Sequence, residues 1–302
     1  MPSEEQQLED YRFITNQAII RFISTIENGP SFSYDAVTGN FDGEGLSIGL
    51  IQFNFGGDAQ ITFGNIDRRV FLRHMPRWGE QFYRAVHTQS SKRAIALVVQ
   101  MQSQSGKTWR VQPDALAELR AFLSSPESKS AQDKRVAYEF AKASSRAKQW
   151  AEARGESTPS NREIANFFDN QVFSGGALNG IWLDQAKAFR AKFSSDAEMA
   201  SFVASWLKSC PVKGPKALYG AAEGAANGEI WSRKLAAGTK LSESQSLLFS
   251  LGFLRGLAAV GPADDPSQAG VFKSQVVSRR GLIATSWGTA NGVPWPGGPL
   301  DR

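Results

Sequence analysis

The chain has 302 residues, of which 41% are hydrophobic and 21% charged, so it is long enough to bury a substantial core. Its single cysteine, Cys210, and its two histidines, His74 and His87, exclude a disulfide framework and argue against a Cys-rich or His-rich metal centre. The net charge of +5 fits either an ordinary surface or an anionic polymer as partner, and no nucleic-acid-binding motif is present.

The chain begins with an acidic, polar segment, residues 1–12, that does not resemble a signal peptide, so we expect synthesis in the cytoplasm. A long helix is predicted from Ser3 to Glu27, because apolar residues recur three and four positions apart. This stripe comprises Leu8, Tyr11, Ile14, Ala18, Ile19, Phe22, Ile23 and Ile26. Glycine-rich turns in residues 32–63 then predict short strands and a tight hairpin.

The remainder of the chain has mainly helical patterns and no aliphatic run long enough for a membrane span. The predicted helices cover 66–75, 78–87, 91–102, 113–124, 132–154, a segment from Ser160 or Asn161, 181–192, 195–209, 216–236, 242–260 and one segment after 270. We expect loops at 124–134 and 154–162 and a loose tail at 292–302. The fold class is therefore α+β and mainly α-helical.

No internal repeat is visible, and we expect a single domain of two helical lobes rather than two independent domains. The first lobe would contain residues 1–125 with the C-terminal segment 271–292, and the second lobe residues 130–260. The small hairpin or sheet would lie beside the catalytic cleft.

Residues 45–49 match G-x-S-x-G, the nucleophile elbow of serine hydrolases. An elbow needs a histidine base and a parallel sheet, yet both histidines lie within 40 residues of Ser47 and no alternation of strands and helices follows. We therefore do not expect Ser47 to be a nucleophile. The "SGKTW" segment at 105–109 is likewise rejected as a phosphate loop, because Met101 stands where that motif needs glycine.

Two acidic residues have contrasting surroundings. Glu27 lies on the apolar side of the first helix and in its last turn, where both burial and the helix dipole favour a protonated carboxyl group. Asp42 lies in the polar "FDGEG" turn, where backbone amides and water favour the ionised form. Such a pair is the standard apparatus for glycoside hydrolysis. Alternatively, Glu27 turns to water and Asp42 only shapes a hairpin; Glu44 and Asp35 compete for the second role.

These residues resemble the signature of family 46 chitosanases and their peptidoglycan-cleaving relatives in the lysozyme-like superfamily. In that pattern a Glu ending the first long helix is the general acid, an Asp in a D-G-x-G-x-[ST] loop is the general base, and a hydroxyl residue five positions later holds the attacking water. Glu27, Asp42 and Ser47 match these roles. The segments 167–176, which contains Asp169, and 276–292 resemble two further stretches of the family. The resemblance implies a two-lobed lysozyme-like fold.

The resulting hypothesis is an inverting hydrolysis without a metal or cofactor. Peptidoglycan is the expected substrate, because a basic chain suits the carboxylates of that polymer. The residues expected to bind substrate are Gln52, Asn54, Tyr34, Glu44 and Asp169. The alternatives are a chitosanase, a lytic transglycosylase and a non-catalytic wall-binding module. The "SxGLMQ" segment of lytic transglycosylases is similar to residues 47–52. We expect the protein to act in the periplasm or cell wall of a target bacterium, reached through a secretion machinery, a phage lysis system or a longer parent protein. We also expect an immunity protein as inhibitor, and neither nucleic-acid nor membrane partners.

Overall fold

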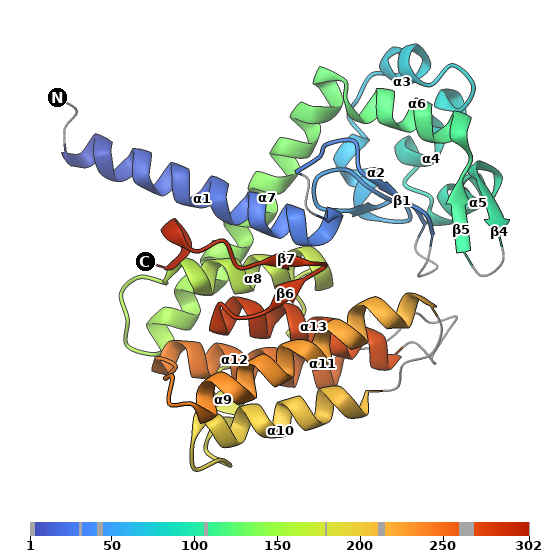
Figure 1. Ribbon diagram of the computed structural model, residues 1–302. Coiled ribbons are helices and arrows are strands. Elements are labelled where there is room, and N and C mark those ends of the chain that lie inside the picture. The colour runs from blue at the N-terminus through green and yellow to red at the C-terminus, as the bar shows by residue number, and fades with distance from the viewer. Residues whose placement is uncertain are drawn as a thin grey trace. The chain divides into compact units, whose positions relative to one another are not determined.

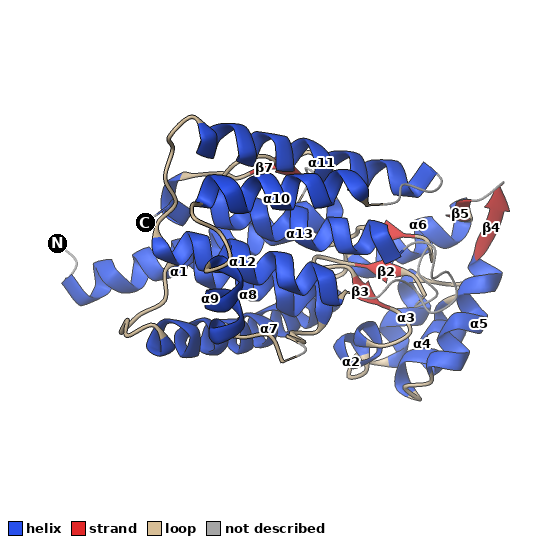
Figure 2. Ribbon diagram, turned by 90° about the horizontal axis from the view of Figure 1, so that it is seen from below, coloured by secondary structure: helices blue, strands red, loops and turns tan. Residues whose placement is uncertain are grey.

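The structure is a computed structural model that describes residues 4–29, 32–40, 45–105, 108–178, 180–210, 215–259 and 269–301. These residues form 13 α-helices and three small antiparallel sheets, so the predicted mainly helical α+β class is confirmed (Figure 1, Figure 2). The chain divides into two compact units. The large unit contains residues 1–30 and 139–302, and the small unit contains residues 31–138.

The small unit holds a three-stranded sheet of order β1-β2-β3, surrounded by short helices (Figure 1). Its elements are β1 (Val37–Thr38), β2 (Ser47–Ile48), β3 (Phe53–Asn54), α2 (Asp58–Phe63), α3 (Arg68–His74), α4 (Gly79–His87), α5 (Ser91–Met101), β4 (Gln102–Ser105), β5 (Thr108–Val111), α6 (Pro113–Leu123) and the first part of α7 (Pro126–Ala153). Helix α2 and the β4–β5 hairpin were not predicted.

Phenylalanine rings from these elements form the core of the small unit. Phe55 stacks on Phe82 with ring centres 4.3 Å apart, and Phe71 stacks on Phe122 at 4.6 Å. All four rings are fully buried. Because each ring comes from a different segment, their burial joins the sheet to α3, α4 and α6.

Gln132 of α7 anchors the sheet. Its Oε1 accepts a hydrogen bond from the backbone N–H of Leu50 at 2.9 Å, and its Nε2 donates to the carbonyl of Tyr34 at 3.2 Å. Gly49 has φ of +80°, and a Cβ there would lie 3.0 Å from Cδ of Gln132. Glycine is therefore required at position 49 by both backbone conformation and close approach.

The large unit is a stack of helices (Figure 2). Its elements are α1 (Glu4–Asn28), the second part of α7, α8 (Asn161–Ser174), α9 (Leu183–Arg190), α10 (Asp196–Ser209), α11 (Pro215–Ala236), α12 (Glu243–Ala258), α13 (Ala269–Thr285), β6 (Thr289–Ala290), β7 (Val293–Pro294) and the 3-10 helix η2 (Gly298–Asp301). Helix α13 packs against α8, α11 and α12, and α1 packs against α8.

Small residues let the helices around α13 approach closely. A Cβ at Gly252 of α12 would lie 2.7 Å from Cβ of Arg280, and one at Gly228 of α11 would lie 2.9 Å from Cα of Ala204. On α13 itself, a Cβ at Gly281 would lie 2.5 Å from Cζ2 of Trp231, a ring that is fully buried. At these glycines, atoms of the neighbouring helix lie so close that a larger side chain would clash.

Two predicted loops are wrong. The segment 124–134 is mostly the start of α7, because Pro126 suits a first helical turn and Oγ of Ser125 accepts a hydrogen bond from the N–H of Ser128. The C-terminal tail is ordered by Trp295, whose ring meets Phe22 edge-on at 5.1 Å and whose Nε1 donates to Asp301.

The units also differ from the predicted lobes. Residues 1–30 and 271–292, which we expected in the first lobe, belong to the large unit. The reason is that α1 packs on α8, and α13 packs on α8, α11 and α12. Within the part of the chain that the structure describes, no helix has the length and hydrophobicity needed to cross a membrane.

The close approach at Gly281 gives a test of the packing. In an open helix, Gly→Ala stabilises by up to about 1 kcal/mol. Here we expect Gly281→Ala to destabilise by about 1–3 kcal/mol, because the new methyl group must displace the buried Trp231 ring. Urea unfolding measures this, with the exposed Ser201→Ala in α10 as control, expected to change stability by less than about 0.5 kcal/mol. A stabilised Gly281→Ala protein would contradict the packing.

Candidate active site

Glu27 lies in the last turn of α1, as the apolar stripe predicts. The residues before it on the same helix, Ile19, Ile23 and Ile26, are fully buried. The Glu27 side chain is 12% exposed, so it is largely removed from water.

Arg279 of α13 connects Glu27 to a second carboxylate, Asp169 of α8. Its Nη2 donates to Oε1 of Glu27 and to Oδ1 of Asp169, both at 2.5 Å, and its Nε donates to the same Asp169 oxygen at 2.9 Å. The guanidinium carbon also lies 4.7 Å from the centre of the Phe173 ring. One cation thus bridges two acidic residues from separate helices.

The electrostatic balance at Glu27 favours the protonated acid. Burial raises the pKa of Glu27, Arg279 opposes this through its charge and hydrogen bond, and the negative charge of Asp169 raises it further. The net direction is upward from the ordinary value of 4.5. A raised pKa is the property that a proton-donating carboxyl group requires.

Asp169 is 1% exposed and contacts two arginines. Besides Arg279, Nε of Arg280 lies 3.5 Å from its Oδ2. Burial lowers the pKa of Arg280 to about 10, which leaves it charged at neutral pH. The geometry gives Asp169 a positioning role, because its carboxylate is enclosed; the substrate contact expected from the sequence stays a prediction.

The β6–β7 hairpin holds the end of α1. Nδ2 of Asn291 donates to the carbonyl of Ile26, next to Glu27. The hairpin turn is fixed in turn by Glu223 of α11, which accepts hydrogen bonds from the N–H groups of Asn291 and Gly292, both at 2.9 Å. Sequence reasoning missed Arg279, Arg280 and Asn291 as functional residues. The signal for the arginines was the charged pair within an otherwise apolar segment.

Ser47 lies in β2 of the small unit and pairs with Asn54 of β3. It is 6% exposed, and its hydroxyl forms no hydrogen bond with another described residue. A nucleophile elbow requires a strand-to-helix turn, whereas Ser47 is followed by a second antiparallel strand. The two glycines of the motif serve the backbone, because Gly45 and Gly49 both have positive φ.

The expected substrate-binding residues of the small unit lie near this sheet. Asn54 lines a hollow of about 380 Å³, and its Oδ1 accepts a hydrogen bond from the N–H of Gly56 at 2.8 Å. Gln52 has φ of +56°, so the two-residue repeat of a strand does not place it beside Asn54. Such a conformation is uncommon outside glycine and often marks functional sites. Tyr34 donates its hydroxyl proton to Asp133 at 2.7 Å.

Asp42 and Glu44 lie outside the described residues, so the pairing of Asp42 with Glu27 stays a prediction. Among the described residues, no group of three or more His, Cys, Asp or Glu side chains is arranged to hold a metal ion. Comparison with protein families, curated proteins and solved structures finds no match to this chain. Its function is therefore inferred from its own residues.

The network predicts that Asp169→Asn destabilises the protein. Removing this charge leaves two buried arginines without the carboxylate that both contact, and breaking a buried ion pair typically costs about 3–5 kcal/mol. Chemical unfolding measures the loss. The control is Glu156→Gln, an exposed carboxylate after α7, and equal stability of the two variants would show that the network does not support the fold.

Glu27→Gln should have the opposite effect. Because the folded protein favours protonated Glu27, folding takes up a proton between pH 4.5 and the higher folded pKa, and this contribution to stability is lost as pH rises through that window. Glutamine cannot ionise. We expect the variant to melt on the order of 1–3 °C above wild type at pH 7 and to lose that advantage at pH 4. Thermal melts at several pH values measure this; a lower Tm for the variant at pH 7 would contradict it.

Proposed function

We propose that the protein is a glycoside hydrolase that cleaves the glycan strands of peptidoglycan by an inverting acid–base mechanism. The observation that carries the proposal is the state of Glu27, a largely buried carboxyl group with a raised pKa at the end of a long helix. This is the environment that a glycosidase gives to its general acid.

In this mechanism the Glu27 carboxyl group transfers its proton to the glycosidic oxygen as the bond from that oxygen to the anomeric carbon breaks. Arg279 then stabilises the carboxylate that remains, since it already donates a hydrogen bond to Oε1. Asp42 takes a proton from a water molecule that attacks the anomeric carbon from the opposite face. The two carboxyl groups would need to be roughly 6.5–9.5 Å apart to leave room for that water.

Ser47 supports the proposal in a secondary way. Its hydroxyl forms no hydrogen bond with another described residue, which leaves it available to hold the attacking water. Its strand neighbour Asn54 lines a hollow that can receive polar sugar groups.

The net charge of +5 favours an anionic polymer over the cationic chitosan. The proposal also includes delivery of the enzyme to a target bacterium and an immunity protein that protects the producer.

Solubilisation of purified sacculi tests the mechanism. We expect Glu27→Gln and Asp42→Asn to lower the rate by about 10²–10⁴-fold, the usual contribution of general acid–base catalysis. Ser47→Ala should lower it by roughly tenfold, the value of about one hydrogen bond. Glu156→Gln, with an exposed side chain, should act as wild type.

Three results would contradict the proposal. Wild-type rates in both carboxylate variants would mean that neither carboxyl group is catalytic. Anhydro-muramic ends in the released muropeptides would mean a transglycosylase, because no water is then added. Release of reducing ends from chitosan but not from sacculi would mean a chitosanase.

A further inference from the structure

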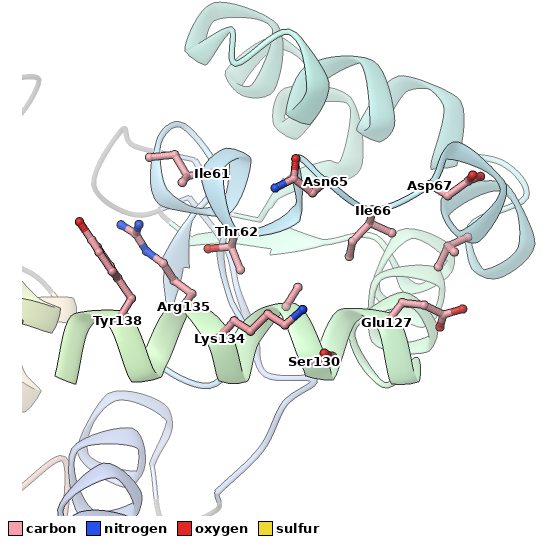
Figure 3. A pocket seen from close by; sticks show the side chains of 12 residues that line it. Ile61, Thr62, Asn65, Ile66, Asp67, Glu127, Ser130, Lys134, Arg135 and Tyr138 are labelled. Atoms are coloured by element: carbon pink, nitrogen blue, oxygen red, sulfur yellow. The ribbon is translucent and has the colours of Figure 1, made fainter. Parts of the chain in front are cut away.

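A second recess lies in the small unit, between α7 on one side and α2, the following loop and α3 on the other (Figure 3). It has a volume of about 570 Å³, within the range of roughly 300–1,000 Å³ common for small-molecule sites. We call it the α7 groove. The α7 wall consists of Glu127, Ser130, Ala131, Lys134, Arg135 and Tyr138, and the opposite wall of Ile61, Thr62, Asn65, Ile66, Asp67 and Val70.

The residues of the α7 wall recur three and four positions apart, so they form one continuous stripe of the helix. From Glu127 to Tyr138 this stripe extends about 16 Å at 1.5 Å per residue. Tyr138 is 56% exposed and Ile61 on the facing wall is 54% exposed. The guanidinium carbon of Arg135 lies 5.4 Å from the centre of the Tyr138 ring, so Arg135 covers part of that ring. The groove therefore offers a partly exposed aromatic ring and an apolar contact at one end, together with polar side chains such as Asn65 along its length.

The charges of the groove leave a positive excess. Asp67 pairs with Arg69 at 3.1 Å, and Glu127 lies 3.9 Å from Arg73. On α7, Arg135 pairs with Asp58 at 3.0 Å. Lys134 is exposed and forms no ion pair with any described residue. Its ammonium group is therefore available to an anionic ligand in a groove whose carboxylates already have partners.

The groove adjoins the hollow at Asn54. Ile61 lines both recesses, and Asp58, the partner of Arg135, lines the hollow. A chain molecule in contact with Asn54 could thus pass over Ile61 and reach Tyr138 and Lys134 without leaving the small unit. An extended polymer matches this arrangement better than a single compact ligand does.

We propose that the α7 groove binds a carboxylate-bearing sugar residue of a glycan strand, away from the reacting bond. Tyr138 stacks on the sugar ring, Asn65 contacts its hydroxyl groups, and Lys134 binds its carboxylate. Aromatic side chains with one exposed face combine apolar area with a polar edge, which suits a sugar. This inference rests on the proposed function, because it adds a second contact to the same anionic polymer.

Binding of soluble glycan strands tests the groove. The strands are freed of stem peptides by amidase treatment, which leaves the lactyl carboxylates of their muramic acid residues free, and are labelled with a fluorophore. Fluorescence anisotropy is measured with the full Glu27→Gln chain, so that cleavage is slow during the measurement. In this background we expect Lys134→Glu to weaken binding about tenfold or more and Tyr138→Ala about fivefold.

Matched variants separate binding from folding. Lys240→Glu makes the same change of charge at an exposed loop lysine, and Tyr138→Phe keeps the ring; both should bind within about twofold of the parent chain. Strands whose carboxyl groups are reduced to alcohols should bind the parent chain as weakly as untreated strands bind Lys134→Glu. Circular dichroism and Tm confirm that each variant is folded.

Several results would overturn the inference. These are equal binding by Lys134→Glu, Tyr138→Ala and the parent chain, no binding of peptide-free strands, or competition by free stem peptides alone, which would make the peptide the ligand. A different measurement tests the proposed function: it would be contradicted by unchanged sacculus solubilisation by the Glu27→Gln chain. The groove can therefore fail while the catalytic proposal holds, and the reverse is also distinguishable.

Discussion

The bridge from Glu27 through Arg279 to Asp169 is the contact on which the candidate site depends. Arg279 lies 252 residues after Glu27, and 110 residues after Asp169, yet one guanidinium group holds both carboxylates. Burying an arginine is costly unless its charge is compensated, so Arg279 requires the Asp169 carboxylate beside it. The interaction joins α1, α8 and α13, and it fixes the position of the carboxyl group that we assign to proton donation.

The position of Arg279 follows from the packing of α13. The helix is buried from residue 276 to 285, and it has close neighbours because glycines lie at the contacts on α12, at Gly252, and on α13, at Gly281. Because these close contacts leave α13 no room to rotate, the direction in which each of its side chains points is fixed. Packing of small residues therefore sets the direction of Arg279, and through it the electrostatics at Glu27.

Local patterns in the sequence identify most helices and the burial of the first one, because a periodic apolar stripe depends only on nearby residues. They fail where distant contacts decide. Segment 124–134 reads as a polar loop, but Ser125 and Pro126 start a helix there. The sequence of the tail predicts a loose segment, but the Trp295 ring packs against Phe22. The position of Glu27 on the predicted helix identifies it as a candidate. The contact of Arg279 with Glu27 can be recognised only from the folded structure.

A cation beside the proposed general acid raises the question of why it does not simply hold Glu27 ionised. The geometry suggests that Asp169 prevents this, because it takes two hydrogen bonds from Arg279 while Glu27 takes one. The charge of Asp169 also raises the pKa of Glu27, in the same direction as burial. Arg279 is thus close enough to stabilise the carboxylate formed by proton transfer, but its charge is already largely compensated before that transfer. A raised pKa beside a nearby cation suits an acid that must hold a proton and then release it.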